Sequence, residues 1–212
     1  WSARRVSAGL IEEQLRKFLL TLWNTYSFWV LYASLEGFDV AGEPVPVGDR
    51  SELDRWILAE LNDTIEVSTA SLEGFDPTTA GRRLDAFVDD LSNWYVRRSR
   101  RRFWRSAGET DTQAAFWTLW ECLVAVAQLT APFTPFVSEE IYTNLTAPLA
   151  GTDRVSQSVH MSDWPATHAE RSDDTLRRRM RLVRRLVGVR YLRPISAPRA
   201  QRLAPSASHG CG

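Results

Sequence analysis

The 212-residue sequence is poor in cysteine, in lysine and in long apolar runs. Its two cysteines, Cys122 and Cys211, lie too far apart for a metal knuckle and are too few for a disulfide framework. This usage is typical of a reducing compartment, so we expect a cytoplasmic protein. No apolar run approaches the roughly 20 residues of a membrane span, and no signal peptide is visible. Lys17 is the single lysine against 25 arginines, a bias typical of a GC-rich genome.

The residue combinations of common catalytic and metal sites are also missing. His160, His168 and His209 are isolated, with no partner at metal-ligand spacing. The sequence contains no glycine-rich phosphate loop and no Gly-x-Ser-x-Gly motif, and neither cysteine has a histidine nearby. A catalytic site needs an identifiable nucleophile, base and orienting group. We therefore expect no catalytic residue, no metal site and no cofactor in this chain.

The formal net charge of zero conceals a strong asymmetry along the chain. Residues 36–90 carry a net charge of −10, and residues 171–202 carry +9. Such asymmetry is a pointer to nucleic acid. The alternative is that these acids and arginines pair with each other between neighbouring helices.

Apolar residues at three- and four-residue steps predict an all-α bundle with almost no strand signal. Ser51 with Asp54 resembles a capping box, Asp76-Pro77 is a typical helix start, and Thr110 with Gln113 can cap a further helix. Residues 147–166 are expected to form a long connection, in which 158–164 is the stretch that fits a short strand. The expected helices are 11–34, 52–72, 77–104, 111–131, 136–145 and 176–187.

One heptapeptide, Ala-Ser-Leu-Glu-Gly-Phe-Asp, occurs twice, at residues 33–39 and 70–76. A tetratricopeptide-like array has a similar period, but no third copy follows and the two helices differ in length. We interpret the repeat as the same helix-ending chemistry used twice, with Gly37 and Gly74 each in the left-handed position after the helix.

The most informative segment is an arginine run near the end of the third expected helix. Six arginines occur between Arg97 and Arg105, with no acid among them and with aromatic residues on both sides. Arginine binds phosphate oxygens bidentately, and aromatic rings offer bases a stacking face. The run therefore points to RNA or another polyanion. The alternative is an ordinary basic helix end with intramolecular ion pairs.

A helical wheel divides the arginines of this run into two sets. Arg97, Arg100 and Arg101 fall away from the apolar stripe of the helix and are expected to be exposed. Arg98 and Arg102 continue the stripe, so we expect them to pair with acids at the bundle end or to be partly buried.

Three stretches of the sequence, in this order and spacing, resemble the anticodon-binding domain of isoleucyl-tRNA synthetases, which are class I aminoacyl-tRNA synthetases. They are Arg16–Phe28, Ser92–Arg98 continuing to Arg102–Trp104, and Leu129–Phe136. Valyl- and leucyl-tRNA synthetases share the bundle and a looser Trp-Tyr element. The resemblance covers about residues 1–187.

The resemblance implies a helical bundle that binds the anticodon region of tRNA(Ile), in an enzyme that joins isoleucine to this tRNA with ATP and Mg²⁺. It makes Arg97, Arg100 and Arg101 candidates for phosphate or base-edge contacts, and Trp104 a candidate for base stacking. Trp94 fits either the core or a contact. The family's His-x-Gly-His and Lys-Met-Ser-Lys-Ser signatures are absent, so we expect a fragment without catalytic and editing domains.

The expected organisation has three parts: the anticodon-binding bundle at 1–150, a connection with a further helix at 151–187, and a divergent, disordered tail at 188–212. The sequence begins without methionine, which also suggests a piece of a longer chain that includes the rest of a synthetase. The alternatives are a free-standing helical module that binds RNA or protein, and the same domain from a valyl- or leucyl-tRNA synthetase.

Overall fold

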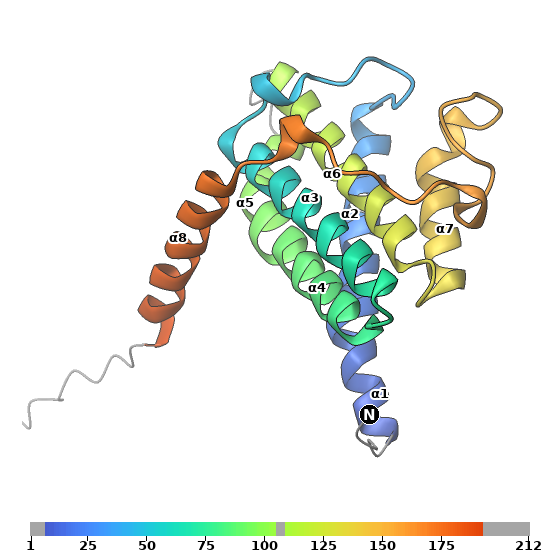
Figure 1. The fold of residues 1–212 in the computed structure, drawn as a ribbon. Coiled ribbons are helices and arrows are strands. Elements are labelled where there is room, and N and C mark those ends of the chain that lie inside the picture. Colours follow the sequence, from blue (N-terminus) through green and yellow to red (C-terminus); the bar gives the residue numbers. More distant parts are fainter. Residues whose placement is uncertain (1–6, 105–108, 193–212) are drawn as a thin grey trace, which may run out of the picture. The chain divides into compact units, whose positions relative to one another are not determined.

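The computed structural model describes residues 7–104 and 109–192. Within these ranges the regular structure is helical and contains no β-strand, which confirms the all-α prediction (Figure 1). The chain divides at Arg177 into two units, which are considered separately. The first unit contains α1 (Ala8–Gln14), η1 (Leu15–Leu19), α2 (Leu20–Glu36), η2 (Val47–Asp49), α3 (Glu52–Glu73), α4 (Pro77–Asp89), η3 (Asp90–Val96), α5 (Arg97–Trp104), α6 (Glu109–Thr130), α7 (Pro135–Thr146), η4 (Ala147–Leu149), η5 (Val159–Met161) and η6 (Ala169–Arg171).

The first expected helix, 11–34, is present as α1, the π-helical turn η1 and α2 in continuous succession. Leu22, Tyr26 and Trp29 of its predicted apolar face are buried. Leu15 is 43% exposed, although the spacing places it on the same face. Leu15 begins η1, directly after α1, which extends past the ends of α3 and α4 (Figure 1), so this end of the helical segment is covered less than α2.

Helices α3 and α6 form the centre of the core, and α3 is buried on more than one side. Its residues Trp56, Ile57, Leu58 and Leu61 are at most 1% exposed. The helix packs antiparallel to α4 and also contacts α6 (Figure 1). Fully burying one such side chain contributes roughly 1.5–3 kcal/mol, so α3 is, with α6, a major apolar support of the bundle.

Two of the three predicted caps are found. Ser51 and Asp54 form a reciprocal capping box at the start of α3, and the Asp76 carboxylate accepts a hydrogen bond from the N–H of Thr79 at the start of α4. The third expectation, a cap at Thr110, is wrong. Because α6 already begins at Glu109, Thr110 lies inside its first turn.

The two heptapeptides do not end their helices alike, so the expectation for Gly74 is wrong. Gly37 has a φ of 63° in the left-handed region, whereas Gly74 has a φ of −81°. In the second copy the left-handed residue is Phe75, with a φ of 57°. The reversal of the chain is therefore shifted by one residue, because Asp76 must act as the N-cap of α4.

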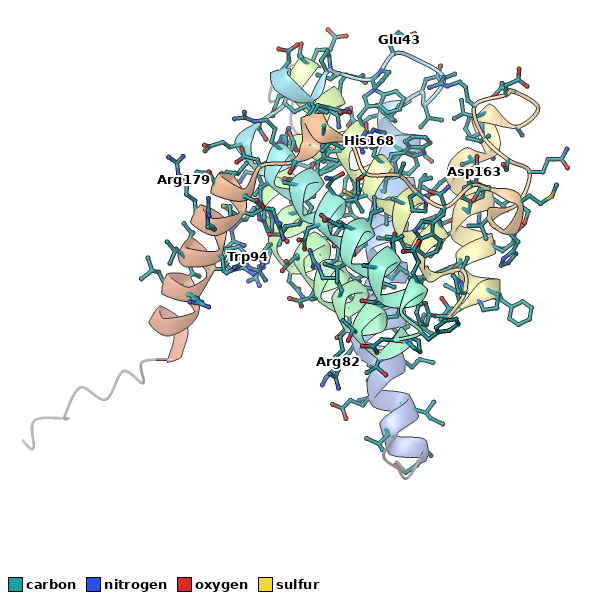
Figure 2. All side chains as sticks on the ribbon, viewed as in Figure 1. Glu43, Arg82, Trp94, Asp163, His168 and Arg179 are labelled. Atoms are coloured by element: carbon teal, nitrogen blue, oxygen red, sulfur yellow. The ribbon has the colours of Figure 1, made fainter. Side chains whose placement is uncertain are left out.

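A long connection follows α7, as expected, and it is held against α3 and α6. The indole N–H of Trp164 donates to Thr69 Oγ1 at 2.8 Å, and the N–H of His168 donates to Asn62 Oδ1 at 2.7 Å. Figure 2 labels His168 on this segment. The short strand expected at 158–164 is wrong. Ser158 accepts a hydrogen bond from the N–H of His160, and this favours the 3₁₀ turn η5.

Three acids of the acidic segment, Asp54, Glu60 and Asp63, form ion pairs with arginine, so the alternative interpretation of the charge asymmetry is met for part of the segment. Arg83 bridges Glu60 and Asp63 at 2.9 and 3.0 Å. Arg177 contacts the same two acids at 3.4 and 2.7 Å. These pairs join α3 to α4 and to residue 177. Part of the negative charge of this segment is therefore neutralised within the protein, and only the remainder can act on a charged partner.

The last expected helix is α8 (Asp174–Leu192), which runs past the boundary at Arg177. The sequence places its end at about Val187, whereas the described helix extends to Leu192. The tail predicted at 188–212 is thus helical up to 192, and residues 193–212 lie outside the described residues.

Candidate nucleic-acid interface

The arginine helix is the end of a long helical segment that runs through α4, η3 and α5. The side chains of Leu84, Leu91 and Tyr95 are at most 2% exposed and fix the rotation of the segment against the bundle. Near its end Phe103 is fully buried, with its ring edge-on to Phe28 of α2 at 5.1 Å. The apolar side therefore determines which arginines face solvent.

Arg102 anchors α5 to the starts of two other helices. Its guanidinium binds both carboxylate oxygens of Asp54 at 2.7 Å, and it also donates to Asp111 at 2.7 and 2.9 Å. Asp54 is fully buried and also accepts hydrogen bonds from Ser51 and from the hydroxyl of Tyr95 at 2.6 Å. Arg102 is thus paired and partly buried, as expected.

The charges in this cluster stabilise each other. Burial opposes ionisation of Asp54, but the hydrogen bonds and charge of Arg102 outweigh it and lower the pKa of Asp54. Burial also opposes the charge on Arg102, but Asp54 and Asp111 raise its pKa above the ordinary value. Burial, together with the Asp54 charge, raises the pKa of Tyr95 well above the ordinary value. The cluster is therefore a fixed ion pair that orients α5.

The three arginines predicted to be exposed are exposed. Arg97 lies at the start of α5, and Arg100 and Arg101 lie one turn further along it. The guanidinium carbon of Arg100 lies 5.9 Å from the ring centroid of Phe28, in reach of a cation–π interaction. This arrangement holds the stem of Arg100 against α2, while its charged group can still reach a phosphate.

Trp104 is 44% exposed, and its ring centroid lies 5.7 Å from that of Tyr32 on α2. One side of the indole is supported by protein, and part of it remains open to solvent. Supported, half-exposed aromatic rings are the usual platforms on which unpaired bases stack. The structure therefore brings Trp104 to the same end of α5 as Arg100 and Arg101.

Of the two alternatives expected for Arg98, a pair with acids at the bundle end or partial burial, partial burial is wrong, because Arg98 is exposed. Its guanidinium carbon lies 3.7 Å above the ring of Trp94, which Figure 2 labels beside the same helical segment. The acids that bind Arg102 lie at the first turns of α3 and α6. Arg98 precedes Arg102 by one turn of α5. Trp94 is half-buried under this contact.

Sequence reasoning missed three contributors to this surface. Phe28 and Tyr32 of α2 support Arg100 and Trp104, and Asp111 is the second partner of Arg102. Phe28 and Tyr32 are four residues apart on one helical face, which is a signal of a shared surface. Nothing in the sequence indicates that this surface meets α5.

The described residues contain no group of three or more His, Cys, Asp or Glu side chains that could hold a metal ion. Burial raises the pKa of the Cys122 thiol, so this cysteine is not an activated nucleophile. His160 and His168 are exposed, and His209 lies outside the described residues. No described helix is long and apolar enough to cross a membrane.

Residues 54–191 match the sequence model of the family described as the anticodon-binding domain of tRNA ligase. This match covers more than half of the chain, and it includes α3 to α6 and the Asp54–Arg102 pair. The chain therefore belongs to the family of anticodon-binding domains of tRNA ligases. The resemblance seen in the sequence is confirmed, and a free-standing module of another kind is not the favoured interpretation.

Similar curated proteins are isoleucine–tRNA ligases. The protein of Deinococcus radiodurans is 49% identical over 184 residues, which are 87% of this chain and 16% of that protein. The protein of Dehalococcoides mccartyi (strain 195) is 48% identical over 86% of this chain and 18% of its own length. The protein of Thermus thermophilus is 46% identical over 87% of this chain and 17% of its own length. The chain thus spans about a sixth of these relatives.

Proposed function

We propose that this chain is the part of an isoleucine–tRNA ligase that binds the anticodon region of tRNA(Ile). The observation that carries the proposal is the Arg102 anchor. It holds α5 by two buried or half-buried carboxylates, and it leaves Arg97, Arg100 and Arg101 exposed beside Trp104. A rigid basic face next to an aromatic platform suits a single-stranded RNA loop.

In this proposal the arginines and Trp104 have different tasks. Arg97, Arg100 and Arg101 bind phosphate oxygens or base edges, because a guanidinium presents several donors in a fixed plane. Trp104 stacks on a base. We assign the binding of isoleucine, ATP and Mg²⁺ to regions of the parent enzyme outside this chain. We expect the enzyme to act in the cytoplasm.

The proposed organisation keeps residues 1–150 as the anticodon-binding bundle and 151–187 as a connection with a further helix, and it places the start of the tail after α8 instead of at 188. The contacts of the connection with α3 and α6 support its role as a brace of the bundle. The family match extends to residue 191, so α8 also belongs to the matched domain.

The test is a titration of the parent ligase with tRNA(Ile) and with an anticodon-swapped tRNA at two salt concentrations. Arg97→Ala, Arg100→Ala and Arg101→Ala are measured one at a time. A lost phosphate contact should weaken both tRNAs equally and reduce the salt slope by about one unit. A lost base contact should cost about 1–3 kcal/mol and relax the anticodon preference.

Arg82→Ala is the matched control. Arg82 is exposed on the same continuous helical segment, roughly 20 Å along the axis from α5, and Figure 2 shows it near the other end of the helix. It should leave affinity, salt slope and preference unchanged. If all three α5 variants behave like Arg82→Ala, the arginine helix does not contact the RNA.

A further inference from the structure

The helical segment from α4 to α5 buries residues that a regular α-helix would not place on one face. Phe87, Leu91, Tyr95, Ser99 and Phe103 follow each other at four-residue steps, and all five are 0% exposed. In an α-helix each step of four residues turns the side chain by roughly 40° beyond a full turn, so Phe103 would lie about 160° from Phe87. The segment therefore departs from regular α-helical geometry between these two residues.

The departure is the π-helical turn η3, which covers Asp90–Val96. A π-helical turn is closed by i→i+5 hydrogen bonds, so it contains one residue more than an α-helical turn. One extra residue removes about 100° of the rotation, which leaves roughly 60° between Phe87 and Phe103. This angle lies within the roughly 100° width of one buried helix face.

The same extra residue explains why Arg98 is exposed. On a regular wheel Arg98 follows Leu91 by seven residues and lies about 20° from it, on the buried stripe. With one residue taken up by η3, Arg98 lies about 120° from Leu91, and Ser99 takes its place on the buried stripe. Arg98 therefore joins the exposed side of α5, where Arg101, three residues further along the helix, is its neighbour.

Trp94 fixes the direction of the Arg98 side chain. The guanidinium carbon lies 3.7 Å from the centroid of the Trp94 ring, and this indole is itself half-buried (Figure 2). A cation above an aromatic face is attracted to it, while the outer N–H groups of the guanidinium stay in water. A side chain held in this way loses little conformational freedom when it binds a further group, which favours a contact with a phosphate oxygen.

We propose that Arg98 is a fourth RNA-binding arginine of α5, which binds a phosphate oxygen, and that the extra residue of η3 is the positioning element that turns it to the exposed face. The proposal rests on the proposed function, because that function brings RNA to α5. Single π-helical turns inside α-helices are frequent at functional sites. Arg102, in contrast, is the structural anchor of α5 through Asp54 and Asp111.

The first test measures the binding of tRNA(Ile) to the parent ligase with Arg98→Ala and with Arg98→Lys. Each neutralised phosphate contributes about 0.9 to the slope of log affinity against log salt concentration. Arg98→Ala should therefore bind about five- to tenfold more weakly near 0.1 M salt, and this difference should vanish near 1 M salt. Arg98→Lys keeps the charge and should keep the slope. Both variants should melt within a few degrees of the unaltered protein, because the replaced side chain is exposed.

Arg82→Ala is the control for the loss of one exposed arginine from the same helical segment, and it should bind like the unaltered protein. The inference is overturned if Arg98→Ala has the affinity and salt slope of Arg82→Ala, or if its main effect is a loss of many degrees in melting temperature. If Arg97→Ala, Arg100→Ala or Arg101→Ala weakens binding while Arg98→Ala does not, the proposed function holds and only this inference is wrong.

A pair of deletions tests the role of η3. Asn93 is exposed within η3, and Ala86 is exposed in the regular helix α4. Deletion of Asn93 removes the extra residue, so the turn should become α-helical while the buried face and Arg98 keep their places. Deletion of Ala86 removes a residue that a regular helix needs, so one end of the segment should turn by about 100°.

The Asn93 deletion should therefore keep the melting temperature within a few degrees and retain RNA binding, whereas the Ala86 deletion should lower both strongly. Thermal unfolding and the same RNA titration measure the two deletions. Equal losses of melting temperature in the two variants would show that η3 holds no extra residue and would overturn its role as the positioning element.

Discussion

Two identical heptapeptides of this protein adopt different structures. In the first copy, Gly37 is left-handed, and the N–H groups of Gly37 and Phe38 donate to the carbonyl of Ala33. In the second copy, Gly74 has an ordinary backbone conformation, and Phe75 takes the left-handed one. A left-handed conformation costs a residue with a side chain roughly 1–2 kcal/mol. Identical local sequence therefore does not fix which residue reverses the chain.

The different turns are caused by the segments that come after the two copies. The second copy leads directly into α4, for which Asp76 is the N-cap and Pro77 the first residue. The N–H of Asp76 donates to the carbonyl of Ser71 at 2.8 Å, which closes the turn one residue later than in the first copy. The first copy leads into a loop instead, so Gly37 can take the left-handed position.

The two phenylalanines show the consequence for packing. Phe38 is half-buried among Trp29, Phe116 and Trp117, and it lines a cavity beside α5. Phe75 is 89% exposed at the turn between α3 and α4. The same seven residues therefore place a phenylalanine in an aromatic cluster in one copy and on an exposed turn in the other.

The largest expected difference between the copies concerns these two phenylalanines. Phe38→Ala should lower the free energy of unfolding by about 2–3 kcal/mol, because it removes an aromatic side chain that packs against three other rings. Phe75→Ala should change it by less than about 0.5 kcal/mol, since the side chain is exposed. Urea denaturation of both variants measures the difference. Equal losses would show that Phe75 also packs in solution.

The two glycines should differ by a smaller amount. Gly37→Ala should lower the free energy of unfolding by about 1–2 kcal/mol, because alanine is strained at a φ of 63°. No steric clash adds to this loss, since an added Cβ would meet no atom within 4 Å. At Gly74 an added Cβ would lie 3.3 Å from the carbonyl oxygen of Ala70. Replacing glycine with alanine makes the unfolded chain less flexible, which raises the free energy of unfolding by about 0.4–1 kcal/mol. The close contact at Gly74 opposes this gain in stability.

Gly74→Ala should therefore be nearly neutral. Thermal unfolding of the two alanine variants under one buffer condition measures both effects. A Gly74→Ala variant as unstable as Gly37→Ala would mean that the second turn also uses its glycine in the left-handed conformation.

The same contrast explains how much of the fold could be predicted. The apolar stripe of the α4–α5 segment and the capping box of Ser51 and Asp54 depend on residues a few positions apart, and both were predictable from the sequence. The second role of Asp54, as the partner of Arg102, joins residues far apart in the chain. No local pattern carries that information.

The candidate interface divides in the same way. A helical wheel was enough to predict that Arg97, Arg100 and Arg101 would be exposed, because exposure follows from the apolar face of one helix. The support of Trp104 by Tyr32 and that of Arg100 by Phe28 depend on the packing of separate helices. These features became visible only in the folded structure.

The smallest expected difference concerns the last residue of each copy and depends on pH. The hydroxyl and N–H groups of Thr79 donate to Asp76 and hold the pKa of its carboxyl below the ordinary value. A lowered pKa in the folded state stabilises the protein above the unfolded-state pKa of about 3.9, and this contribution is lost as the pH falls through the folded-state pKa. Asp76→Ala should therefore be less stable than the unaltered protein at pH 7.

This stability gap should begin to narrow as the pH falls below the unfolded-state pKa of about 4, and it should close as the pH passes through the lower folded-state pKa of Asp76. Asp39→Ala is the matched control, since Asp39 accepts a hydrogen bond from the N–H of Ala41 in a loop and begins no helix. It should show the smaller gap at pH 7. Denaturant titrations of all three proteins between pH 7 and pH 3 measure the gaps. A gap for Asp76→Ala that stays constant over this range would mean that the charge of Asp76 does not contribute to the cap, and that the two copies end in the same way energetically despite their different geometry.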